Sequence, residues 1–214
     1  MHSAVVFGGD DESAQEAWRR HVPPDNEVAG TVAVDAVVSR TDSVAVTLRF
    51  LRVHSTGVLL SFVLQRRSDP DPMTAFPLRP VDTDVLLGVE LADGSTVAVS
   101  PGGGFDATGP RDRQAPVLHL NGGGGGGREY EMVYWLTPLP PSGDLVVVVA
   151  SVPLALPEAR VIVTAQALAA ARDRCVALWP REPDRPCDPG THASPEVPPG
   201  GWFERVLGTG PGIA

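Results

Sequence analysis

The chain has 214 residues, 43% of them hydrophobic and 20% charged, which is enough for one substantial core. All 17 basic residues are arginine, so the sequence excludes a Schiff-base lysine, a lysine general base and a P-loop lysine. The formal net charge of −9 argues against nucleic acid and anionic membrane surfaces as partners, because both are bound mainly through clustered basic side chains.

The N-terminal segment, residues 1–27, is predicted to be loosely ordered, with a short helix over residues 13–20 that ends before Pro23 and Pro24. It has neither a basic region nor the apolar stretch of a secretory signal. The longest apolar stretch, residues 145–156, is interrupted by a serine and a proline, and a membrane-spanning helix needs about 18–20 apolar residues. We therefore expect a cytoplasmic protein with reduced cysteines.

Residues 28–180 are predicted to form one domain, because most of its apolar residues alternate with polar ones as in half-buried strands. A phase slip inside residues 44–53 indicates a β-bulge or a change of face, and the stretch 146–149, apolar on both faces, predicts a central strand. The expected strands follow one another through turns without intervening helices. This pattern predicts a mainly β fold, an antiparallel two-sheet β-sandwich with one C-terminal α-helix. The strands are expected near residues 31–39, 44–53, 58–64, 85–91, 96–99, 117–120, 130–136, 145–152 and 160–163.

The apolar period changes after residue 163. Thr164 is the predicted N-cap of a helix over residues 165–178, with Leu168, Ala171, Cys175 and Leu178 on its apolar face. Residues 181–214 are rich in proline and glycine, which predicts an extended or disordered tail. Trp202 and Phe203 are the exception within that tail, because they could dock onto the domain or onto a partner.

Six consecutive glycines are the most unusual feature of the chain, and they lead directly into an aromatic stretch. Phosphate-binding glycine loops open a helix, whereas these glycines precede a predicted strand and no lysine follows. Nucleotide binding is therefore not expected. A loop without side chains would let a partner's backbone or a flat ligand come close, or it could be a slack connector. The six glycines are Gly122, Gly123, Gly124, Gly125, Gly126 and Gly127.

The aromatic strand after the glycines places Tyr134 and Trp135 on opposite faces, of which one must face the core. If Trp135 faces solvent, it marks a binding surface beside the glycines. The leading hypothesis is a non-catalytic binding or assembly module that meets a protein partner or a second copy of itself. Its binding residues would be Gly122–Gly127, Arg128, Tyr134 and Trp135.

Two other hypotheses remain open. His119, Arg128 and Glu129 flank the glycines and could form the site of a small hydrolase-like or ligand-modifying enzyme, although a lone histidine near a strand end is more often structural. A strand-edge dimer in which the glycines only connect two sheets is the third. No spacing of histidines and cysteines matches a metal site, and no cofactor motif is present, so neither is expected.

Several segments between residues 17 and 180 resemble, in sequence and order, a family of proteins from GC-rich actinobacteria with no established activity. These segments are AWRRHVPPDNE (17–27), RTDSVAV (40–46), RVHSTG (52–57), LGVELADG (87–94), the glycine run, YWLTPLPPSG (134–143) and ALWP (177–180). The resemblance implies no function, cofactor or site. It does imply that the glycine run and the proline-rich segment after Trp135 are family features.

Overall fold

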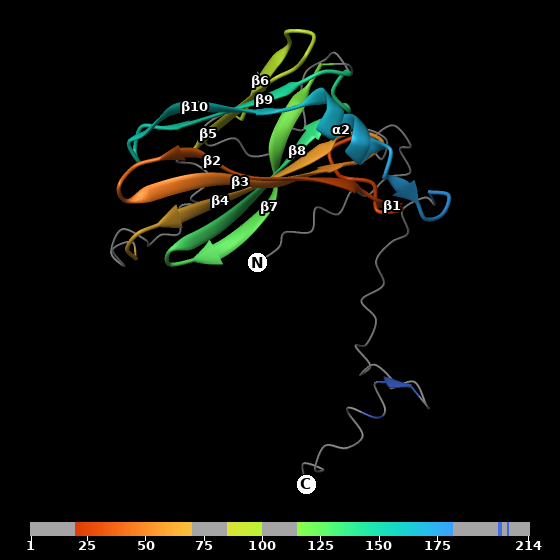
Figure 1. The fold of residues 1–214 in the computed structure, drawn as a ribbon, viewed down its shortest axis with the longest axis horizontal. Coiled ribbons are helices and arrows are strands. Elements are labelled where there is room, and N and C mark those ends of the chain that lie inside the picture. The colour runs from red at the N-terminus through yellow and green to blue at the C-terminus, as the bar shows by residue number, and fades with distance from the viewer. Residues whose placement is uncertain (1–19, 70–84, 100–114, 182–200, 203–204, 206–214) are drawn as a thin grey trace, which may run out of the picture. The chain divides into compact units, whose positions relative to one another are not determined.

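A computed structural model describes residues 20–69, 85–99, 115–181, 201–202 and 205 (Figure 1). The chain divides into two compact units, Met1–Pro180 and Arg181–Ala214. The predicted helix over residues 13–20 and most of the predicted tail, including Phe203, lie outside the described residues.

The described part of the first unit is mainly β, with antiparallel sheets and a single helix, as the sequence predicts. The largest sheet has the strand order β2-β3-β4-β8-β7, and the next has the order β10-β9-β5-β6. A third sheet, not predicted, pairs β1 (Glu27–Val28) with β11 (Val176–Ala177). The five strands of the largest sheet are β2 (Gly30–Arg40), β3 (Val44–Val53), β4 (Val58–Arg66), β8 (Glu129–Thr137) and β7 (Val117–Gly126); the four of the next are β10 (Leu156–Val163), β9 (Leu145–Ser151), β5 (Leu86–Glu90) and β6 (Thr96–Ala98).

Apolar side chains from both larger sheets form one hydrophobic core. Figure 1 shows β9 and β10 layered over β2 and β3. Because side chains alternate across a strand, every second residue of β4 and β9 enters this core, and so does every second residue of β3 on each side of its bulge. The prediction of a central strand near residues 145–152 is confirmed, since β9 pairs with β10 on one side and β5 on the other. The predicted bulge is also confirmed, as a register shift between Leu48 and Phe50 of β3.

The helix α2 (Ala165–Arg172) is shorter than the predicted 165–178. Thr164 caps it as expected, accepting a hydrogen bond from the backbone N–H of Ala167 at 3.3 Å. The chain then turns, and Val176–Ala177 pair with β1, because a strand partner is available there for the backbone. Cys175 and Leu178 are therefore not on a helix face, and Leu178 is 48% exposed.

The helix rests on β2 at a point where only glycine fits. A Cβ atom added to Gly30 would lie 1.7 Å from the carbonyl oxygen of Ala171, which is fully buried. This close approach fixes one end of α2 against the largest sheet.

Candidate functional site

The glycine run is mostly a strand, which corrects the predicted loop. Residues Gly122 to Gly126 belong to β7 and pair with β8 from Val133 to Glu129, so that only Gly127 and Arg128 remain in the turn. The backbone groups of these glycines that face β8 pair with it, which orders the segment as a strand. The alternative of a slack connector is likewise wrong for these five residues.

The glycines of β7 are of two kinds. A Cβ atom at Gly123 would lie 2.5 Å from the carbonyl oxygen of Glu131, and one at Gly125, where φ is +147°, would lie 2.3 Å from that of Glu129. Glycine is therefore required at these two positions for β7 to approach β8 so closely. The others meet nothing within 4 Å of an added Cβ, so they leave bare backbone beside solvent; these are Gly122, Gly124 and Gly126.

The β7 strand is the last strand of its sheet, and no described strand pairs with its outer edge. About half of the backbone N–H and C=O groups of such a strand point away from its one neighbour. Residues 123–127 are exposed, and their glycines carry no side chains that would cover these groups. We call the segment Gly122–Gly126 the glycine edge.

Tyr134 and Trp135 are both buried, at 2% and 0% exposure, so neither forms part of a surface. Tyr134 meets the Phe62 ring in the core at 6.0 Å between ring centroids. On the other face of β8, Trp135 donates from Nε1 to the carbonyl oxygen of Arg20 at 3.0 Å and meets the His54 ring edge-on. The condition for their predicted binding role, a Trp135 that faces solvent, is not met, because the segment before β1 covers that face of β8.

Arg128 lies in the exposed turn between β7 and β8. Its Nη2 donates to Oδ2 of Asp69 at 3.2 Å, and its carbonyl oxygen accepts from the backbone N–H of Arg66 at 2.7 Å. Of the predicted binding residues, Arg128 and the glycines are therefore together at one accessible end of the sheet.

The structure does not bring His119 together with Arg128 and Glu129. His119 lies opposite Trp135 in the register, whereas Glu129 lies opposite Gly126, seven residues further along β7. At about 3.3 Å per residue, this separation is roughly 23 Å. His119 Nε2 donates to the carbonyl oxygen of His21 at 2.8 Å, and burial lowers the pKa of His119. It is a structural histidine.

A polar cluster that sequence reasoning missed lies beside β1. The carboxylate of Glu27 accepts hydrogen bonds from the backbone N–H and the hydroxyl of Ser55 and from Cys175 Sγ, and His54 Nδ1 lies 3.7 Å from it. Burial raises the pKa of Glu27, but the hydrogen bonds from Ser55 and Cys175 and the neighbouring His54 together outweigh it and leave this pKa below its ordinary value. No sequence signal could have joined residues 148 positions apart.

This cluster is not arranged for nucleophilic catalysis. Burial first, and then the neighbouring Glu27, raises the pKa of the Cys175 thiol, whereas a nucleophilic cysteine needs a lowered pKa. Burial also lowers the pKa of His54, so its ring is held neutral. Among the described residues, no group of three or more His, Cys, Asp or Glu side chains is placed to hold a metal ion. The cluster ties β1, the turn after β3 and the turn after α2 together.

Within the described residues, no helix has the length and apolar character to cross a membrane. No protein-family model, no curated protein and no solved structure matches the chain.

Proposed function

We propose that the chain is a non-catalytic binding or assembly module whose glycine edge accepts an extended strand from another protein chain. The observation that carries the proposal is that, among the described strands, five consecutive glycines of β7 are paired on one side only. Adding a strand to an open sheet edge is a recurrent mode of peptide recognition, in which main-chain hydrogen bonds supply the affinity. We place this module in the cytoplasm, without a cofactor.

The energetics of β7 favour such an addition. Each backbone hydrogen bond contributes about 0.5–1.5 kcal/mol net, whereas ordering one residue costs about 1–2 kcal/mol, and most for glycine. The glycine edge gains almost nothing from side-chain packing, so one row of hydrogen bonds holds it weakly. A second strand on the open side would provide another row without ordering the glycines again.

The sequence of β7 also lacks the features that usually protect an edge. Sheet edges are commonly blunted by lysine, by proline or by inward-pointing charges. Between residues 117 and 126 the chain has no proline, no lysine, no arginine and no acidic residue. The bare positions at Gly122, Gly124 and Gly126 leave room for the side chains of an incoming strand.

The test introduces a charged side chain where it disturbs only the open edge. In Gly124→Lys the new side chain enters open space, so the β7–β8 pairing is retained. Val37→Lys is the matched control, because Val37 is 56% exposed on β2, the opposite edge strand of the same sheet. Both variants must first show the melting temperature of the wild type.

Oligomeric state by light scattering and capture from a lysate of the native cells distinguish a second copy from a different partner. We expect the wild type and Val37→Lys either to self-associate or to retain a defined partner. Gly124→Lys should lose whichever of these interactions the wild type shows. A wild type that stays monomeric and captures nothing would overturn the proposal. So would a Gly124→Lys variant that associates as the wild type does.

A further inference from the structure

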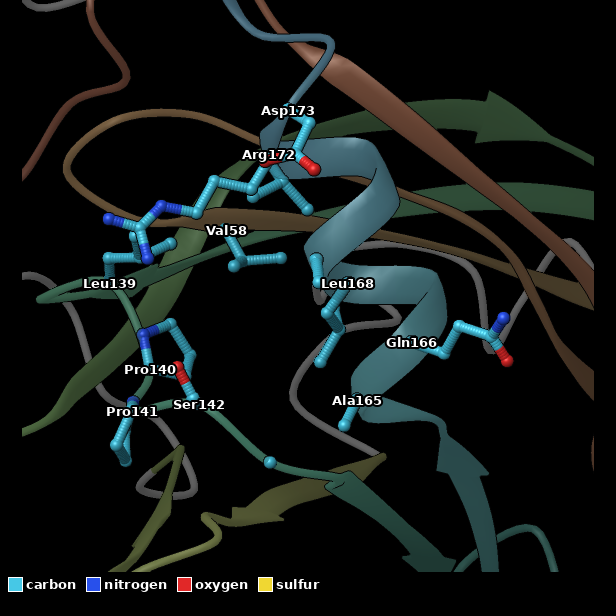
Figure 2. A pocket seen from close by; sticks show the side chains of 13 residues that line it. Val58, Leu139, Pro140, Pro141, Ser142, Ala165, Gln166, Leu168, Arg172 and Asp173 are labelled. Atoms are coloured by element: carbon cyan, nitrogen blue, oxygen red, sulfur yellow. The ribbon is translucent and has the colours of Figure 1, made fainter.

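A groove separate from the glycine edge lies between α2, the loop over residues 139–143 and the turn that joins β3 to β4 (Figure 2). It encloses about 460 Å³. Sites for small organic molecules commonly measure about 300–1,000 Å³. The groove is therefore large enough for a small ligand, and its lining decides which kind.

Most of the lining is apolar. Val53 and Val58, both nearly fully buried, line the groove from the two ends of the β3–β4 turn. Figure 2 shows Leu168 of α2 facing the groove from one side, with Leu139 and Pro140 on the other. These side chains cannot hydrogen-bond to water, so an apolar ligand would be favoured over water there.

The sequence explains the shape of both walls. Leu168 precedes the buried Ala171 by three residues, so both lie on the side of α2 that faces the sheet. On the opposite wall, Pro140 and Pro141 have a fixed φ and no N–H group, which makes this wall stiff and poor in hydrogen-bond donors. The groove is therefore defined by two rigid apolar walls.

One cation lies at the mouth of this groove. Arg172, in the last turn of α2, extends its side chain toward Leu139 (Figure 2), and no carboxylate among the described residues forms an ion pair with it. In the same view the carboxylate of Asp173 points away from this guanidinium. A guanidinium offers a planar set of donors that matches a carboxylate with two hydrogen bonds.

We propose that this groove binds a small amphipathic carboxylic acid, with its apolar body between Leu168 and the proline wall and its carboxylate on Arg172. The proposal does not rest on the function assigned to the glycine edge, because the two sites share no residue. Ser142 can meet a further polar group of the ligand, whereas the other polar lining residues, Gln166 and Asp173, direct their polar groups away from the Leu139–Ser142 wall (Figure 2).

Anilinonaphthalene sulfonate, a fluorescent apolar anion, and decanoate are suitable probes. We expect the wild type to enhance the fluorescence of the dye with a saturable 1:1 stoichiometry. Decanoate should displace the dye, whereas decylamine, which has the same chain length and the opposite charge, should not. Failure of the dye to bind, or equal displacement by the acid and the amine, would overturn the proposal.

Variants on neighbouring positions of α2 locate the binding. Ala169 lines the groove and Ala170 does not, although both are exposed, so Ala169→Phe should abolish binding while Ala170→Phe retains it. Arg172→Gln should weaken decanoate binding about tenfold, because a charge-assisted hydrogen bond is lost. Arg160→Gln on β10 is the charge control and should leave binding unchanged.

Each variant must keep the melting temperature of the wild type, because dye binding also reports loosened packing. If Ala169→Phe binds as the wild type does, the site lies elsewhere and the proposal is wrong. Gly124→Lys should bind the dye as the wild type does. Dye binding in the groove is therefore a test independent of strand addition at the glycine edge.

Discussion

The two ends of the β7–β8 hairpin contrast sharply, although one antiparallel backbone ladder runs through both. At the Trp135 end, the His54 ring and the Arg20 carbonyl contact Trp135, the Phe62 ring contacts Tyr134, and both faces of β8 are buried. At the glycine end, β7 has no side chains and its outer positions face open space. The contrast shows that backbone pairing sets the register of a strand pair, while side-chain packing decides which part of it is firmly held.

The Trp135 end gains its stability from burial. Trp135 and Leu136 are fully buried, and His119 of β7 reaches across to the segment before β1 through its bond to His21. No comparable packing by described residues holds the glycine edge, where the adjoining ion pair of Arg128 with Asp69 is exposed and such pairs contribute about 0–1 kcal/mol. The end that is weakly held is also the end that is accessible to another chain.

The largest effect should come from removing the anchor of the packed end. Trp135→Ala deletes a fully buried ring together with its hydrogen bond to Arg20, so we expect a loss of about 3–5 kcal/mol in the free energy of unfolding. Urea denaturation measures it. Trp179→Ala is the control, because Trp179 is 58% exposed and its hydrogen bond to Asn26 uses the backbone carbonyl, which the substitution keeps; it should change stability by less than about 0.5 kcal/mol. A similarly small change in the free energy of unfolding in both variants would contradict the claim that burial of Trp135 stabilises this end of the hairpin.

A smaller effect should separate the two kinds of glycine. Gly123→Ala places a methyl group against the carbonyl of Glu131, so we expect a loss of about 1–3 kcal/mol. Gly124→Ala enters open space and restricts the unfolded chain, so it should be neutral or stabilise by about 0.4–1 kcal/mol. The comparison is made by urea denaturation of both variants at one pH. Equal changes in the two variants would show that β7 does not approach β8 as closely as described.

The smallest effect should be a pH dependence confined to the packed end. Burial lowers the pKa values of His21, His54 and His119 from their ordinary 6.5, so these histidines bind protons more readily in the unfolded chain than in the folded one. Their contribution to stability is therefore complete above about pH 6.5 and decreases as the pH falls below it. Glu27 has a lowered pKa, so its own contribution is lost only below its ordinary 4.5.

Denaturation curves between pH 8 and pH 5 measure this effect, and amide hydrogen exchange locates it. We expect protection around Trp135 to decrease toward pH 5, while the glycine edge, which has no histidine, shows no such added loss. His54→Gln should flatten part of the pH dependence. A stability that does not change between pH 8 and pH 5 would contradict the assigned pKa directions.

Much of the fold could be predicted from the period of the apolar residues. The alternation in residues 44–53 and 58–64 predicts the strands β3 and β4, and the apolar stretch near residue 147 predicts the central position of β9. The end of α2 could not be predicted, because the apolar spacing beyond Arg172 suits a helix as well as the strand β11. Pairing with β1, about 150 residues earlier, decides between them.

The candidate site was less accessible to sequence reasoning. The glycine run is visible in the sequence, but it forms a strand because its backbone pairs with β8. Trp135 is buried because the segment around Arg20 lies against it. The groove beside α2 forms where three segments, distant in the sequence, meet in the fold. By itself, the sequence determined where most strands of the two larger sheets lie, since alternation and turn chemistry are local properties of the chain. Only the tertiary structure decided which face is covered and which edge is open, because burial is a property of contacts between distant segments.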